Sequence, residues 1–263
     1  MVAQLLIGLL CASAIAAVSR STALLTPSGA IAQFFLGWTL LGLGGWKWAV
    51  PLLVFFVSSS MFSRLARARK SSVEQRYAKA GSRDALQVLA NGGIAGVMVM
   101  ADFLFPSPHW YVAALGSVGA ATADTWGTEI GVLSHRSPLL LTTLKTVEPG
   151  TSGGLSLLGS SIGGLGGIII GVSGILWVDP GARVQTILIV AFSAVLGAFL
   201  DSLLGATTQA QYQCSICLSR TERSSHCEIP AIRVRGVRFI TNDTVNLVCT
   251  ASGGMMAGIF SFC

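Results

Sequence analysis

Charged side chains are scarce, at 11% of the 263 residues, while 52% of the residues are hydrophobic. This balance excludes a single water-soluble core, since the chain has too little polar surface to cover its apolar residues. No G-x-x-x-x-G-K-[ST] run is present, which excludes an ordinary P-loop nucleotide site. No basic residue precedes the first apolar run, which argues against a cleaved secretory signal. The composition is that of a polytopic membrane protein.

Long apolar runs divide the chain into about eight candidate membrane spans. The second and third are separated only by residues 44–47, so one of them could be re-entrant. We therefore predict an all-α transmembrane bundle that forms a single domain over residues 1–263, with Gly-rich broken or re-entrant helices and a small Cys/His loop. The spans are predicted at 2–19, 24–45, 48–63, 85–105, 109–133, 152–178, 184–206 and 243–262.

Basic residues fall mainly on one side of this topology. Of the 17 lysines and arginines, all but Lys47 and Arg183 lie in segments that share a side when eight spans alternate. The positive-inside rule makes that side cytoplasmic, with both termini outside. Three cytoplasmic loops follow: a basic loop at 64–84, a candidate phosphate-binding loop at 134–151 and a Cys/His loop at 207–242. The net charge of +6 therefore indicates contact with a lipid bilayer and no nucleic-acid partner.

Four carboxylates lie within the apolar runs, where an ionised group must face a cavity, a metal or a partner. Asp102 is near the outer end of its span. Asp124, Glu129 and Asp201 are near cytoplasmic ends. On an ideal helix Asp124 shares a face with Thr128, which suits a pocket lining, although hydrogen bonds to neighbouring helices are the alternative.

The segment from Lys145 to Ser156 joins a Pro-Gly turn and the hydroxyl side chains of Thr151, Ser152 and Ser156 to the start of an apolar run. Helix N-termini present unpaired N–H groups and a positive dipole end, which favour an anion such as phosphate. An ordinary helix cap by Thr151 or Ser152 is the alternative. The predicted phosphate-binding residues are Lys145, Gly150, Thr151, Ser152, Gly153, Gly154 and Ser156.

Amide and carboxyl side chains also occur at the starts of two spans. Asn91 lies two turns into the fourth span, and Asn242, Asp243 and Asn246 begin the last one. A helix cap by Asn242 or Asp243 is again the alternative. Oxygen ligands beside an anion site suit a magnesium ion that bridges substrate phosphates, and phosphoryl transfer needs mainly positioning and charge neutralisation.

The 207–242 loop carries four candidate zinc ligands: Cys214, Cys217, His226 and Cys227. Two ligand pairs can close a tetrahedral Cys3His site that stiffens the loop. A disulfide is disfavoured on a reducing face. Unpaired loop thiols are the alternative.

Several of these motifs together resemble one family. Ala-Asp124-Thr-Trp-x-Thr-Glu129-Ile-Gly, Pro149-Gly-Thr-Ser-Gly-Gly-x-Ser, Asp201-Ser-Leu-Leu-Gly-Ala and Asn242-Asp-x-Val-Asn246, preceded by Val-Leu-Ala-Asn91-Gly-Gly, are similar to the integral-membrane family that contains plant phytyl-phosphate kinase. That family was long catalogued only as a membrane domain of unknown function. The resemblance covers nearly the whole chain in the same motif order.

The resemblance implies transfer of a phosphoryl group from a nucleoside triphosphate, with CTP as the expected donor, to a polyprenyl monophosphate. Phytyl phosphate or geranylgeranyl phosphate would become the diphosphate. By this hypothesis Asp124, Glu129 and Asp201 hold magnesium and act with Lys145 in catalysis. Thr128 would contact substrate or nucleotide, and the nucleotide or metal shell would be completed by Asn91, Asn242, Asp243 and Asn246. A homodimer is compatible with the sequence.

Two other function classes remain open at this point. Glycine-broken helices with carboxylates at their ends also describe ion-coupled carriers of anionic or lipid-phosphate substrates. The absence of a clear internal repeat, and polar residues near one membrane face, weigh against a carrier. A scaffold with a zinc loop and no chemistry would leave the intramembrane carboxylates unexplained.

Overall fold

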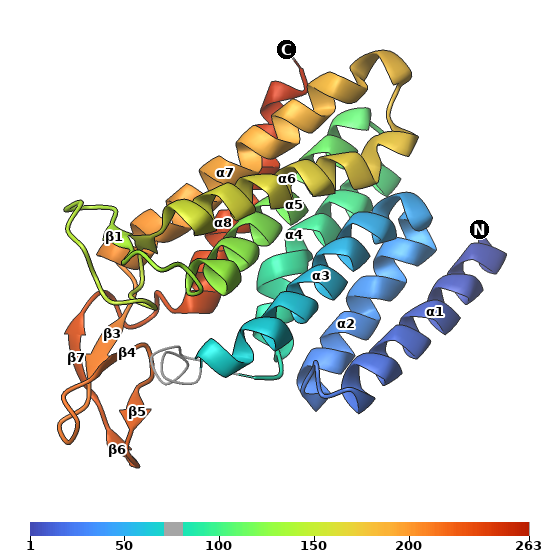
Figure 1. The fold of residues 1–263 in the computed structure, drawn as a ribbon. Helices are drawn as coiled ribbons and strands as arrows, with labels where there is room; N and C mark the ends of the chain where they lie inside the picture. The colour runs from blue at the N-terminus through green and yellow to red at the C-terminus, as the bar shows by residue number, and fades with distance from the viewer. Residues whose placement is uncertain (71–80, 263) are drawn as a thin grey trace.

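The computed structural model describes residues 1–70 and 81–262. These residues form a bundle of eight α-helices that lie side by side (Figure 1). The prediction of an all-α polytopic protein is therefore confirmed. The helices are α1 Val2–Ser21, α2 Pro27–Thr39, α3 Trp46–Lys70, α4 Ala85–Leu104, α5 Pro108–Gly131, α6 Leu157–Gly174, α7 Arg183–Thr207 and α8 Asn242–Phe260.

Five segments of the described chain are long and apolar enough to cross a membrane: α1, residues Trp46–Leu65 of α3, α4, Leu157–Trp177 and Pro180–Thr207. Helix α5 is not among them although it has 24 residues, and 14 of these are buried. Its polar and small residues face other helices, so it lies at the centre of the bundle and needs less hydropathy than a helix that faces lipid. Hydropathy alone therefore undercounts the helices of this bundle.

Glycines allow the central helices to pack closely. A Cβ atom on Gly163 of α6 would lie 2.7 Å from the carbonyl oxygen of Ala123 on α5, and one on Gly116 of α5 would lie 2.5 Å from the carbonyl oxygen of Gly253 on α8. The Thr250 hydroxyl of α8 donates to the Ala90 carbonyl of α4 at 2.8 Å. Small residues on these helices thus allow close helix packing.

The connection between α2 and α3 is confined to fewer residues than the sequence indicated. Helix α2 ends after 13 residues, continues as a π-helical turn at Leu40–Gly44, and stops at Gly45, whose φ of +72° favours glycine. The two helices are separate, and the interruption is confined to residues 40–45. The Gly-rich helix α6 is continuous, and it begins at Leu157, five residues later than predicted.

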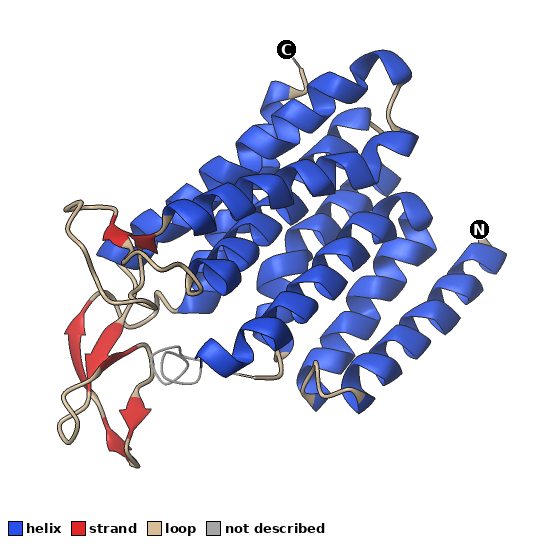
Figure 2. Ribbon diagram, in the orientation of Figure 1, coloured by secondary structure: helices blue, strands red, loops and turns tan. Residues whose placement is uncertain are grey.

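Short antiparallel strands, which the sequence did not predict, all lie at one end of the bundle, opposite the end where the termini lie (Figures 1 and 2). The 310 segments Ile175–Trp177 and Pro180–Ala182 connect α6 to α7. In the strand region β1 Leu139–Leu140 pairs with β2 Gly154–Leu155. In a three-stranded sheet, β3 Gln211–Gln213 lies between β4 Arg220–Thr221 and β7 Ile232–Arg235. Strand β5 Ser225–His226 pairs with β6 Ile229–Pro230.

The predicted loops at 134–151 and 207–242 both lie at this end, which we call the polar end. The loop predicted at 64–84 begins later, because α3 continues to Lys70. Residues 71–80 of that loop lie outside the described residues. Of the cysteines outside the Cys/His loop, Cys249 is buried and Cys11 half-buried, while Cys263 lies outside the described residues.

Candidate functional site

A pocket of about 340 Å³ opens at the polar end between α4, α5, α6, α7, α8 and the loop before α6. It brings together residues that are as much as 183 positions apart in the chain, from Ser63 of α3 to Asn246 of α8. Most of the predicted site residues line it. These are Asn91, Asp124, Thr128, Glu129, Gly150, Thr151, Ser152, Gly153, Gly154, Ser156, Asp201, Asn242 and Asn246.

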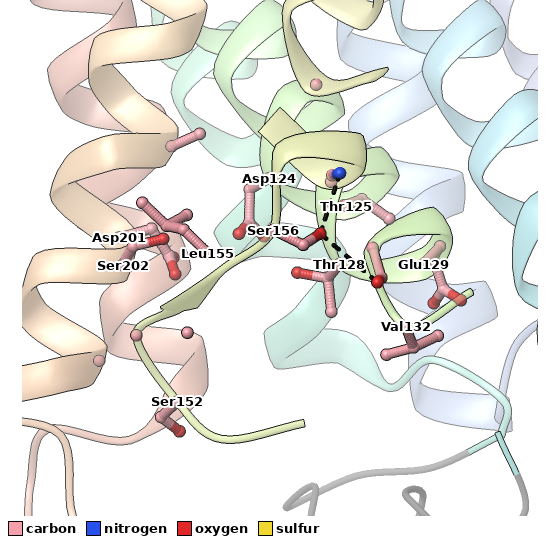
Figure 3. A pocket seen from close by; sticks show the side chains of 18 of the residues that line it. Asp124, Thr125, Thr128, Glu129, Val132, Ser152, Leu155, Ser156, Asp201 and Ser202 are labelled. Carbon is pink, nitrogen blue, oxygen red and sulfur yellow. Dashed lines mark hydrogen bonds between the residues drawn. The ribbon is translucent and has the colours of Figure 1, made fainter. Parts of the chain in front are cut away.

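Asp124 of α5 and Asp201 of α7 meet inside this pocket. Figure 3 shows the two carboxyl groups beside each other next to Leu155, and their side chains interact directly. One oxygen of Asp201, Oδ2, is buried and has no hydrogen-bond partner among the described residues. Two carboxylates brought this close require a shared proton or a cation between them. Their oxygen atoms are ligands that magnesium prefers, so this pair fits a magnesium ion.

Contacts of Trp126 set the rotation of α5 that turns Asp124 toward α7. The Trp126 indole N–H donates to the Ser58 hydroxyl of α3 at 3.2 Å, and its ring packs edge-on against Phe62 with centroids 4.8 Å apart. Asp124 is two residues earlier, about 200° around the helix from Trp126, so it faces the opposite side. The anchoring of α5 on α3 therefore points Asp124 into the pocket.

Glu129 lines the same pocket but lies apart from the aspartate pair (Figure 3). Five residues separate it from Asp124, which places the two side chains about 140° apart around α5. Its carboxylate accepts a hydrogen bond from the Ser63 hydroxyl of α3 at 2.9 Å. The structure thus joins Asp124 with Asp201 and places Glu129 nearer to α3.

The loop over residues 148–154 is held against the end of α7. Gly153 has a φ of +81°, and a Cβ atom there would lie 2.4–2.6 Å from atoms of Ala206. Only glycine satisfies both conditions. Turns within the loop use the amides of Thr151 and Gly154, which donate to the carbonyls of Glu148 and Thr151. Among the described residues, the amides of Gly150, Ser152 and Gly153 then remain for an anion.

Two predicted site residues lie outside the pocket. Lys145 is exposed and does not line it; it lies in a turn in which its backbone carbonyl accepts from the Leu140 amide. Asp243 does not line it either, since it follows Asn242 by one residue and points about 100° away around α8. Neither of these two predicted site residues therefore lines the pocket, because the turn before β2 and the period of α8 place them elsewhere.

The helix caps also differ from the alternatives read from the sequence. Ser156, and neither Thr151 nor Ser152, caps α6 by accepting from the Gly159 amide at 3.0 Å. Helix α8 is preceded by Thr241, which makes no side-chain capping bond. Asn242 and Asn246 therefore line the pocket without serving as the cap.

The pocket is also lined by charged residues that we did not predict as part of the site. Glu222, from strand-rich residues of the Cys/His loop, accepts a hydrogen bond from the Ser152 hydroxyl at 2.5 Å and is close enough to influence both Asp124 and Asp201 electrostatically. The sequence offered only a weak indication of this role, because Glu222 is a single acidic residue between Thr221 and Arg223 in a basic loop. Arg83 and Arg136 also line the pocket.

The four ligand atoms of Cys214, Cys217, His226 and Cys227 all lie within 4.8 Å of one another. The Nδ1 atom of His226 is 3.4 Å from the Cys217 sulfur and 3.2 Å from that of Cys227. Hydrogen bonding with Ser219 lowers the pKa of Cys217 to about 6, which favours the thiolate form that binds metals. The predicted cluster is therefore formed and could hold a metal ion.

Comparison with known proteins agrees with this architecture. Residues 10–254 match the model of the family described as integral membrane protein DUF92. The chain belongs to the DUF92 family. Protein PGR of Arabidopsis thaliana is 28% identical over 98% of this chain and 96% of its own length. An uncharacterised membrane protein of Methanocaldococcus jannaschii is 28% identical over 99% and 95%, and one of Synechocystis is 27% identical over 72% and 74%. No solved structure matches the chain.

The family match confirms the resemblance at the level of the integral-membrane family. The names of these three relatives state no reaction. Any activity of the chain has to be argued from the pocket itself.

Proposed function

We propose that this DUF92 protein is a magnesium-dependent phosphotransferase that converts a polyprenyl monophosphate to the diphosphate, with CTP or another nucleoside triphosphate as donor. The observation that carries the proposal is the Asp124–Asp201 pair in a pocket whose other wall is the glycine loop 150–154. Paired carboxylates beside available amides suit a magnesium ion and the phosphates it would bridge.

The chain's own residues would position and neutralise the reacting phosphates. The loop amides and Arg136 would hold the donor phosphates, and Arg83 would hold the acceptor phosphate. Magnesium, when bound at the aspartate pair, would supply the charge neutralisation that phosphoryl transfer requires. An acceptor phosphate oxygen forms a bond to the γ-phosphorus of the donor, the bond from that phosphorus to the β–γ bridging oxygen breaks, and the nucleoside diphosphate leaves with the electron pair.

The polar end is proposed to face the cytoplasm, where nucleotides are present. Its basic loops agree with the positive-inside rule. A tag accessible at either terminus only from outside sealed cells would support this orientation, and tags accessible only after permeabilisation would oppose it.

The test is turnover by purified protein. Incubation with γ-labelled CTP, magnesium and geranylgeranyl or phytyl phosphate is expected to give labelled polyprenyl diphosphate. A carrier would instead move the lipid phosphate or an anion into sealed vesicles without forming a product. Uptake without turnover would overturn the kinase proposal, and comparison of CTP with ATP, GTP and UTP identifies the donor.

For the Cys/His cluster we propose a structural zinc ion. Three cysteines and one histidine form a closed four-ligand set without room for substrate, as structural zinc sites do. Elemental analysis is expected to give one zinc per chain. A protein without zinc whose three loop cysteines react freely with thiol reagents in the native state would overturn this assignment.

A further inference from the structure

A second cavity lies between α1, α2, α3 and α4, and its lining is almost wholly apolar. The residues around it include Leu36, Leu40, Leu52, Phe55 and Val88. Its polar lining residues are Gln33 on α2 and three residues at or just before the start of α4: Arg83, Gln87 and Asn91. The same three residues line the polar pocket that contains the aspartate pair. The apolar cavity and the polar pocket therefore meet at the start of α4.

Arg83 is held at this junction by its backbone. Its amide donates to the Leu24 carbonyl and its carbonyl accepts from the Thr26 amide, each at 3.0 Å. Its guanidinium carbon lies 5.9 Å from the ring centroids of both Phe55 and Phe56, within the range of a cation–π contact. The connection between α1 and α2 thus fixes one cation between an apolar cavity and a polar pocket.

The charge of Arg83 is partly compensated within the protein. Burial lowers the pKa of Arg83, and the nearby carboxylate of Glu129 acts in the opposite direction. A guanidinium remains charged even so, and its planar donor fork matches the oxygens of a phosphate. The side chain is therefore suited to an anion that arrives at the junction.

The arrangement of apolar cavity, cation and polar pocket is complementary to an amphiphile with a hydrocarbon chain and a phosphate head. We propose that the cavity holds the first part of the hydrocarbon chain of a polyprenyl phosphate, with its phosphate paired to Arg83 and directed past Gln87 and Asn91 toward Asp124 and Asp201. The identity of the lipid rests on the proposed function. The free space is about 70 Å³, so the distal part of the chain would lie between the helices and in the bilayer.

Direct binding tests the location without any need for turnover. Protein in nanodiscs, without nucleotide, is irradiated with geranylgeranyl phosphate that carries a diazirine on the isoprene unit nearest the phosphate. The labelled peptides are expected to come from α2, α3 and α4, and unlabelled geranylgeranyl phosphate is expected to compete. Labelling confined to α6, α7 and α8 would overturn the proposal, as would equal competition by geranylgeraniol, which lacks the phosphate.

The cavity is tested with the same substitution at two places on α4. Val88 lines the cavity, whereas Val97 is 51% exposed and lines neither pocket. Val88→Phe is expected to weaken binding of geranylgeranyl phosphate at least about tenfold while dimethylallyl phosphate, a five-carbon analogue, binds as before. Val97→Phe is expected to bind both as wild type does. Equal effects of the two variants would overturn the cavity assignment.

The cation is tested with Arg83→Gln and a matched Arg64→Gln control. Arg64 donates to the Thr22 carbonyl at 2.8 Å and lines neither pocket. Arg83→Gln is expected to reduce the affinity for both long and short phosphates about tenfold, with partial recovery in Arg83→Lys. Wild-type affinity in Arg83→Gln would overturn the role of Arg83.

The outcomes separate this inference from the proposed function. Lipid binding and labelling at α2, α3 and α4 without any turnover would overturn the kinase and support the cavity. Turnover with labelling elsewhere and a normal Val88→Phe variant would support the kinase and overturn the cavity.

Discussion

Two ligand clusters at the polar end of the bundle differ in chemistry and in surroundings. Asp124 and Asp201 offer oxygen atoms from two helices and open into a pocket of about 340 Å³. The Cys/His cluster offers sulfur and nitrogen from one loop, with all ligand atoms within 4.8 Å. An open oxygen site leaves room for phosphates around a hard cation, whereas a closed thiolate site saturates its ion. Under the proposed function, the first cluster would serve the reaction and the second would stabilise the loop.

Removal of metal ions is expected to reveal the largest difference between the two clusters in their effect on turnover. Brief treatment with EDTA should abolish turnover, and added magnesium should restore it, because the aspartate pair exchanges its ion with solvent through the open pocket. Treatment with 1,10-phenanthroline, which binds zinc and not magnesium, should lower turnover only about tenfold. Immediate loss of all turnover with phenanthroline, together with turnover that does not depend on added magnesium, would place the catalytic ion in the Cys/His cluster.

Asp124→Asn and Asp201→Asn are each expected to lower kcat/KM by at least about 1,000-fold, because the remaining carboxylate alone holds a divalent ion poorly. Initial rates with γ-labelled CTP measure the effect. Asp102→Asn is the matched control, since Asp102 accepts from the Ser107 amide in the α4–α5 connection, outside the pocket. Normal rates in folded Asp124→Asn or Asp201→Asn protein would remove the pair from the reaction.

Gly153→Ala is expected to lower turnover about 100-fold. The added methyl group meets Ala206 of α7 and the backbone must leave the left-handed region, so the loop can no longer rest on α7. Gly93→Ala on α4 is the control, because the nearest atom to its added Cβ would be 3.9 Å away. Equal activity of both variants would show that the loop position does not matter for the reaction.

Cys217→Ser is expected to remove the metal from the Cys/His cluster and to lower turnover about tenfold through misplacement of Glu222. Limited proteolysis should then cut within residues 207–242 while the helices stay intact. Cys11→Ser, on α1, should retain the metal and full activity. Retention of the metal by Cys217→Ser would contradict the cluster as a four-ligand site.

The contact between Ser152 and Glu222 joins the two regions, and its loss is expected to have the smallest effect. Ser152→Ala and Glu222→Gln should each lower kcat/KM about three- to tenfold, and the double variant should be no worse than the poorer single variant. Glu228→Gln in the same loop, which does not line the pocket, should be unaffected. Additive effects would show that the two side chains act separately.

The helices were largely predictable because apolar runs of membrane length are contiguous in the chain. The helix boundaries were less predictable. The 24–45 run contains a 13-residue helix and a π-helical turn, and the helix in the 152–178 run begins only at Leu157. Both shifts occur where glycines and hydroxyl side chains permit turns that hydropathy does not register. The strands have only two to four residues, too few for an alternating pattern.

The sequence by itself determined the membrane class and the inventory of oxygen and sulfur ligands, because hydropathy, helical period and ligand spacing act within single segments. Only the tertiary structure decided which of those groups meet. It paired Asp124 with Asp201, placed Glu129 nearer α3, left Lys145 and Asp243 outside the pocket lining, and added Glu222 and Arg83 to that lining. The rotation of packed helices and the path of the loops at their ends set these pairings, and neither is specified by a local pattern of residues.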